Sequence, residues 1–173
     1  MTPEFSRAER LDMIGGEPRI VKIAADADER RRLAGRFGLI AIDELAATFT
    51  IHHDATGIRA DGRVTATVTQ PCAVTGDPLP ATVDEKVALR FVAAGDAAEE
   101  EVELGEDALD TIEIEGGAID LGEAAAETMM LALDPFPRGP RAAEMLREAG
   151  VVGEDQTGPF SALASLKDKL GKK

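Results

Sequence analysis

The sequence predicts an α+β domain in which an antiparallel meander sheet curls toward a barrel, flanked by two helices, with a short C-terminal helix after a linker. Two patterns predict this class. In the middle of the 173-residue chain apolar residues alternate with polar ones, as in half-buried strands, while the flanking segments carry apolar residues at helical spacing. With a single cysteine the chain has no disulfide framework, so an apolar core must hold it together.

The first helix is expected in residues 24–38, which read AADADERRRLAGRFG. Asp26 is placed to cap this helix, and Glu29 follows three residues later to complete a capping box. Leu33 lies on the apolar face, and Gly38 supplies a stop.

Three strands of a meander are expected next, joined by two turns. The dipeptide Asp61-Gly62 is typical of a tight hairpin turn, and Thr75-Gly76-Asp77-Pro78 marks the second turn. The expected inward-facing residues are Ala47, Phe49 and Ile51, then Val64, Ala66 and Val68, then Val83, Val87, Leu89 and Phe91.

A short strand is expected at residues 111–115, where Ile112 and Ile114 alternate with polar residues. The second helix then begins at Asp120, which caps it, with Glu123 completing a capping box. Asp134-Pro135 ends this helix because proline cannot continue it.

The expected organisation is one α+β domain over residues 1–148, with an acidic loop at about 94–108, a flexible linker over 149–157 and a short basic amphipathic tail over 158–173. In the tail, apolar side chains share one stripe of a short helix; they are Phe160, Leu163, Leu166 and Leu170. So short a helix is marginal alone and must dock on its own core or on a partner.

Charge is segregated along the chain. The net charge is −14, and residues 84–127 carry fifteen acidic side chains against Lys86 and Arg90, a local balance of −13. Residues 158–173 carry +3, from four lysines and one aspartate. The acidic block disfavours broad nucleic-acid binding and attracts basic proteins; alternatively, it is a solvated loop that keeps the domain soluble.

No apolar run approaches the roughly 18 residues that span a bilayer, so no membrane partner is expected and the expected compartment is the cytoplasm. DNA is not expected as a partner either, because the acidic block repels phosphate. No GxSxG, HExxH or phosphate-binding glycine loop occurs, and no cofactor is expected. Cys72 is expected to be structural rather than reactive. His52 and His53 are adjacent, so on a strand they point to opposite faces and cannot jointly bind one metal ion.

Four segments in this order resemble the YceD family of large ribosomal RNA subunit accumulation proteins: VTQPCAVTGDPLP, AIDLGE, LALDPFPR and GPFSALASLK. The DPFPR form is similar to the alphaproteobacterial branch. The resemblance implies a factor needed for accumulation of large-subunit ribosomal RNA, with no established enzymatic activity. Many relatives carry Cys-x-x-Cys at the hairpin turn, whereas this chain has Cys72 and Thr75, so a metal site is not expected here.

The candidate partner-binding residues lie in the proline-rich segment and in the tail. Pro135, Pro137 and Pro140 stiffen DPFPRGP before any partner binds, and Phe136 and Arg138 resemble the aromatic and guanidinium anchors of interfaces. Alternatively, Phe136 plugs the core where the helix ends. The tail candidates are Phe160, Leu163, Leu166, Lys167 and Lys169.

The leading hypothesis is a non-enzymatic assembly factor whose acidic middle binds a basic ribosomal protein or a large-subunit precursor, while the basic tail reaches ribosomal RNA or a ribosomal surface. Two alternatives stay open. One is a small-molecule-binding or hydrolytic barrel, with a pocket converging on Cys72, His52 or His53. The other is a general acidic chaperone for basic proteins.

Overall fold

The structure, a computed structural model, describes residues 3–93, 110–114 and 116–151. They fall into two compact units, one formed by residues up to 70 and from 80 to 135, the other by residues 71–79 and those from 136 onward. In chain order the elements are β1 (Ala8–Arg10), the 3-10 helix η1 (Leu11–Met13), β2 (Arg19–Ala24), α1 (Ala27–Phe37), β3 (Ala41–Asp54), β4 (Gly57–Pro71), β5 (Pro78–Ala93), β6 (Asp110–Ile114), β7 (Ala118–Asp120), α2 (Leu121–Ala132) and α3 (Ala142–Glu148).

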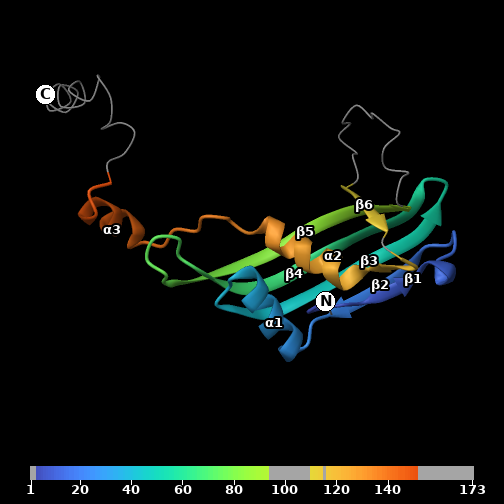
Figure 1. The fold of residues 1–173 in the computed structure, drawn as a ribbon, viewed down its shortest axis with the longest axis horizontal. Coiled ribbons are helices and arrows are strands. Elements are labelled where there is room, and N and C mark those ends of the chain that lie inside the picture. The colour runs from blue at the N-terminus through green and yellow to red at the C-terminus, as the bar shows by residue number, and fades with distance from the viewer. Residues whose placement is uncertain (1–2, 94–109, 115, 152–173) are drawn as a thin grey trace, which may run out of the picture. The chain divides into compact units, whose positions relative to one another are not determined.

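Five strands form the main sheet in the order β2-β3-β4-β5-β6, and β1 pairs with β7 in a small separate sheet (Figure 1). The β2–β3 and β3–β4 pairs are antiparallel, whereas β5 and β6 are parallel. The α+β class is therefore confirmed. The sheet is mostly antiparallel but remains open, with β2 and β6 as its edges, so it does not close into a barrel.

The core lies on one face of the sheet because apolar side chains alternate along each long strand. Phe49, Ile51 and Val64 are completely buried, and the predicted inward-facing residues of β5 are all buried as well. Leu33 of α1 and Met129 of α2 belong to the same apolar cluster, which places both helices over this face (Figure 1).

The predicted hairpin turn at Asp61-Gly62 is wrong, because both residues lie inside the continuous strand β4. The turn comes earlier, between Asp54 and Gly57, where the Asp54 carboxylate accepts hydrogen bonds from the Thr56 N–H and hydroxyl, both at 2.7 Å. Gly62 serves close packing instead, since a Cβ there would lie 2.4 Å from the Thr48 carbonyl oxygen.

Helix α1 begins as predicted. The Asp26 carboxylate accepts hydrogen bonds from the N–H groups of Asp28 and Glu29, and the Glu29 carboxylate accepts one from the Asp26 N–H, which completes the capping box. Asp120 caps α2 as predicted, but Glu123 does not complete a box. Its carboxylate binds Arg36 of α1 instead, at 2.5 and 2.9 Å.

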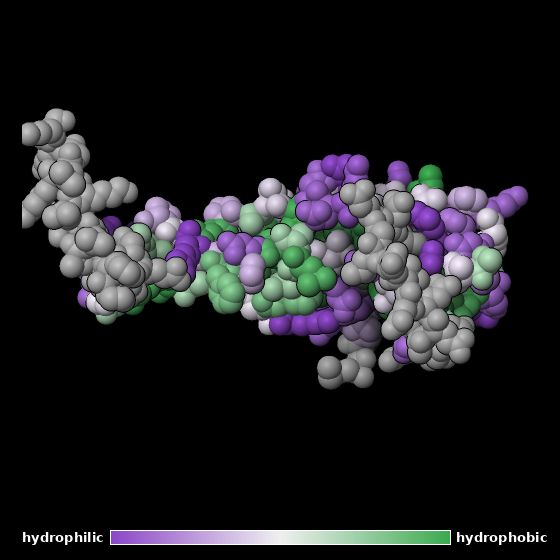
Figure 2. All heavy atoms as spheres, turned by 90° about the horizontal axis from the view of Figure 1, so that it is seen from above, coloured by the Kyte–Doolittle hydropathy of each residue, from purple (hydrophilic) through white to green (hydrophobic). Residues whose placement is uncertain are grey.

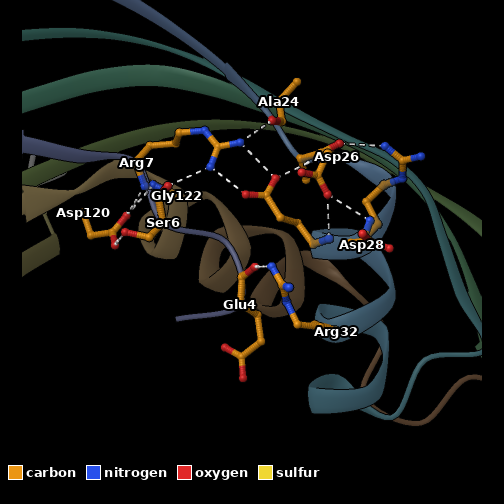
Figure 3. A network of polar contacts seen from close by, with 12 residues as sticks. Glu4, Ser6, Arg7, Ala24, Asp26, Asp28, Arg32, Asp120 and Gly122 are labelled. Carbon is orange, nitrogen blue, oxygen red and sulfur yellow. Dashed lines mark hydrogen bonds and ion pairs between the residues drawn. The ribbon is translucent and has the colours of Figure 1, made fainter. Parts of the chain in front are cut away.

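Arg7 holds the N-terminal segment against α1 (Figure 3). Its guanidinium donates two hydrogen bonds to the Glu29 carboxylate, at 2.7 and 2.9 Å, and one each to the carbonyl oxygens of Ser6 and Ala24. The same segment reaches α2, because the Asp120 carboxylate accepts from the Ser6 hydroxyl at 2.5 Å and from the Arg7 N–H at 2.8 Å. One short segment thereby joins the starts of both helices.

Helix α3 is an element that the sequence patterns did not predict. The acidic loop, most of the predicted linker and the whole tail at 158–173 lie outside the described residues. Within the described residues no helix is both long and apolar enough to span a membrane.

Candidate functional site

The turn between β4 and β5 forms the first half of the candidate site. The Cys72 N–H donates to the Asp77 carbonyl oxygen at 2.8 Å, and the Gly76 N–H donates back to the Cys72 carbonyl oxygen at 2.9 Å. The Thr75 hydroxyl donates to the Asp77 carboxylate at 2.7 Å. The predicted turn at residues 75–78 is thus closed by its own backbone and side chains.

The proline-rich segment after α2 forms the second half, and three contacts bind it to that turn. The Ala73 N–H donates to the Pro137 carbonyl oxygen at 2.8 Å, and the Gly139 N–H donates to the Cys72 sulfur at 3.3 Å. Arg141 forms an ion pair with Asp77. Both halves belong to the second unit, so the stiffness expected from the prolines is reinforced by contacts on both sides of Arg138.

Phe136 and Arg138, the two predicted anchors in this segment, are exposed. Phe136 exposes 72% of its surface, which excludes the alternative in which it plugs the core. Their role in partner binding stays a prediction. The tail candidates lie outside the described residues; they are Phe160, Leu163, Leu166, Lys167 and Lys169.

Other large apolar side chains are exposed too, so exposure alone does not distinguish Phe136. Ile20 of β2 is 67% exposed and Leu131 of α2 is 86% exposed. Apolar surface also gathers in the middle of Figure 2, between hydrophilic regions. Phe136 differs in its setting, since it alone among the large exposed apolar residues of the described parts stands between two prolines.

Cys72 is buried, with an exposed fraction of 3%, and belongs to the internal bonding of the site. The Gly139 N–H, followed by the Thr75 hydroxyl and nearby N–H groups, lowers the pKa of the Cys72 thiol to about 6. A thiolate at neutral pH strengthens the bond to Gly139, because hydrogen bonds to an ionised acceptor are the stronger ones. The Cys72 side chain therefore connects the turn to the proline-rich segment.

The two histidines do not join this site. His52 lies opposite Arg59 and His53 opposite Ile58 in the β3–β4 pair, so consecutive side chains leave opposite faces of the sheet. Among residues 3–93, 110–114 and 116–151, no three His, Cys, Asp or Glu side chains are grouped so as to hold a metal ion.

The ion pair between Asp77 and Arg141 was missed from the sequence. These residues are 64 positions apart, and neither lies in a sequence motif that predicts the contact with the other. The only available signal was the turn chemistry around Asp77, which marks one end of the contact and says nothing about the other.

A family model described as "Large ribosomal RNA subunit accumulation protein YceD" matches residues 60–167, more than half of the chain. The matched range includes the whole turn at 71–79 and the segment at 136–141. Neither the curated proteins nor the solved structures gave a match.

Proposed function

Because the chain belongs to the YceD family, we propose that it is a non-enzymatic factor in ribosome biogenesis that acts by binding a basic ribosomal protein or a large-subunit precursor particle. The family match is the observation that carries this proposal. Its description gives the chain a role in the accumulation of large-subunit ribosomal RNA. We further propose that it works on precursor particles in the cytoplasm.

The candidate site supports a binding role because it presents its anchors on a rigid support. Phe136 and Arg138 project from backbone that is fixed by prolines and tied to the neighbouring turn through Ala73 and Asp77. A side chain held in place before binding loses little conformational entropy when a partner arrives, and aromatic and arginine side chains dominate interface energies. We assign the partner contact to these two residues.

The acidic and the basic parts of the chain are proposed to bind different partners. The acidic stretch at 84–127 favours a basic protein partner and repels phosphate. The tail at 158–173 carries +3, and we assign it to ribosomal RNA or to a ribosomal surface. Lys167 and Lys169 are the proposed phosphate-facing residues of the tail, with Phe160, Leu163 and Leu166 on its apolar side. Both attractions weaken as salt rises.

Cosedimentation with ribosomal particles tests the proposal. Tagged protein in a lysate at low salt is expected to migrate with large-subunit precursors in a sucrose gradient, and deletion of residues 158–173 is expected to reduce this fraction. Phe136→Ala and Arg138→Ala are expected to reduce it as well. The matched controls are Ile20→Ala, which removes another exposed apolar side chain, and Arg147→Ala, which removes an exposed cation of α3.

Two results would count against the proposal. Failure of the unmodified protein to migrate with any ribosomal particle at low salt would remove its basis. Equal binding of purified histones and ribosomal proteins would favour the general acidic chaperone instead, because it would show attraction to basic charge without ribosomal selectivity.

A further inference from the structure

A pocket of about 350 Å³ lies between α2 and the strands β6 and β7 of the first unit. Its volume is at the low end of the range of roughly 300–1,000 Å³ that ligand pockets occupy. Apolar side chains form much of its lining, including Phe91 and Ile119, which are buried, and Ile112, which is half-buried. Ala124 of α2 also lines the pocket, and its side chain is a single methyl group that takes up little of the space.

The pocket lies beside the last of the described strands in the main sheet. Three consecutive residues of β6, from 112 to 114, line it, although successive side chains of a strand point to opposite faces. Three consecutive residues of a strand can line one pocket because the backbone between the side chains also contributes atoms to its wall. β6 is the last of the described strands in the sheet order, so within the described residues no strand pairs with its outer edge, and an added extended segment can pair there.

The carboxylates at the start of α2 and along it border the same pocket, and they differ in the hydrogen bonds and ion pairs that they already form. The Asp120 carboxylate accepts hydrogen bonds from Ser6 and from the first N–H groups of α2, and the Glu123 carboxylate is paired with Arg36. Glu127 lies one helical turn beyond Glu123 on the same side of α2. Like Glu113 of β6, which lines the same pocket, Glu127 is exposed and forms no ion pair among the described residues.

An apolar floor beside an unpaired carboxylate matches one kind of side chain. Arginine and lysine lay their aliphatic stems on apolar surface while the charged head reaches a polar rim. Arginine fits better, because its planar guanidinium binds a carboxylate through two parallel hydrogen bonds. The remaining carboxylates around the pocket exclude acidic side chains by repulsion.

We propose that the groove between α2, β6 and β7 receives an extended, arginine-bearing segment of a basic protein, with an arginine head at Glu127 and its stem on Ile112 and Ile119. This inference rests on the proposed function, because it names where the basic partner binds. The strand edge accounts for the extended form of the segment, and the rim charge accounts for its sign. The groove makes one contact with the partner, and the exposed side chains of Phe136 and Arg138, which we call the Phe136 surface, make another.

A peptide-binding measurement on the full chain tests this assignment. The probe is a short dye-labelled peptide of alternating valine and arginine, with both ends blocked, and binding is followed by fluorescence anisotropy. Its control is the same peptide with citrulline in place of arginine, which keeps the shape and removes the charge. Wild-type protein is expected to bind the arginine peptide more tightly than the citrulline peptide, and the difference is expected to shrink as salt rises.

Charge variants locate the binding. Glu127→Gln is expected to weaken binding roughly two- to fivefold, the range of an exposed ion pair, and Glu127→Lys by about tenfold. The matched control is Glu85→Lys, which changes the net charge equally at an exposed carboxylate of β5 outside the pocket lining. Equal weakening by Glu127→Lys and Glu85→Lys, with circular dichroism unchanged, would overturn the inference. Equal binding of the two peptides would do the same.

Two further results separate this inference from the proposed function. If Glu127→Lys abolishes peptide binding while cosedimentation with precursor particles stays at the wild-type level, the groove does not hold the partner, and the proposed function stands. If deletion of residues 158–173 is needed before the peptide binds, the groove holds the chain's own basic tail, which overturns the assignment to a partner. Wild-type protein that binds the peptide through Glu127 but no ribosomal particle would instead contradict the proposed function.

Discussion

Removal of the Arg7 guanidinium should destabilise the first unit more than any single surface ion pair can. Arg7 donates four hydrogen bonds, two to the Glu29 carboxylate and two to backbone carbonyl oxygens. The side chain of Glu29 is only 11% exposed, so Arg7→Ala leaves a nearly buried carboxylate without its cation. Among the described residues, Arg7 is the ion-pair partner of Glu29.

The size of the effect follows from the burial of the two partners. Breaking a buried ion pair from one side costs about 3–5 kcal/mol of unfolding free energy. The side chain of Arg7 is 34% exposed, so solvent screens part of the pair, and we expect a loss of about 2–3 kcal/mol. Arg10→Ala is the matched control, because the Arg10–Asp12 pair is exposed at 73% and 61% and is expected to contribute less than about 1 kcal/mol.

Urea unfolding followed by circular dichroism measures both values, since the chain has no tryptophan or tyrosine for fluorescence. The midpoint is expected to fall clearly for Arg7→Ala and only slightly for Arg10→Ala, with the slope unchanged. A loss for Arg7→Ala no greater than that for Arg10→Ala would refute the idea that this network joins the two helices.

The same pair predicts a dependence on pH. Hydrogen bonds from Arg7 are the main cause that lowers the pKa of Glu29 below its ordinary value of 4.5. A carboxyl group whose pKa is lowered by folding stabilises the fold fully above that ordinary value, and this contribution is lost as pH falls through the lowered pKa. The difference in unfolding free energy between wild-type protein and Arg7→Ala should therefore be largest above pH 4.5 and should shrink as pH falls through the lowered pKa of Glu29.

Three further predictions have definite expected outcomes. Gly122→Ala should cost about 1–3 kcal/mol of unfolding free energy, because its Cβ would lie 2.5 Å from a backbone carbonyl oxygen; an unchanged urea midpoint would contradict this. Phe136→Ala should leave the melting temperature nearly unchanged because the ring is 72% exposed, whereas Phe49→Ala, at 0% exposure, should cost about 3–5 kcal/mol. Absorbance of the thiolate at ultraviolet wavelengths should titrate with a midpoint at about pH 6 for Cys72 in the folded protein, and a midpoint above pH 8 would show that the N–H groups do not reach the sulfur.

Local chemistry predicted the first two helices and the strand faces well. The capping box of Asp26 and Glu29 involves residues three positions apart, so short-range sequence contains all the information it needs. The alternation in β5 placed Val83, Leu89 and Phe91 in the core for the same reason. These features are set by contacts within one turn or along one strand.

Errors arose where distant residues decide the outcome. Asp61-Gly62 has turn chemistry, but Gly62 is required by the approach of Thr48 from the neighbouring strand. Glu123 was predicted to cap its own helix, and Arg36 of another helix takes its carboxylate. No local pattern contains those partners.

The candidate site was predicted in part for the same reason. Its exposed anchors, Phe136 and Arg138, stand in a proline-rich segment that is recognisable from the sequence. The support beneath them depends on Ala73, Cys72 and Asp77, which approach only when β4 and β5 have paired. The groove beside Glu127 likewise needs β6 and α2 in place before it exists.

Crosslinking in living cells tests most directly whether the chain works by binding ribosomal precursors through the Phe136 surface. A photoreactive amino acid is placed at position 136, and at position 20 as the control on another exposed apolar side chain. The account predicts crosslinks from position 136 to large-subunit ribosomal protein or precursor RNA, well above those from position 20. Equal crosslinking from both positions, or crosslinks from position 136 only to proteins unrelated to the ribosome, would contradict it.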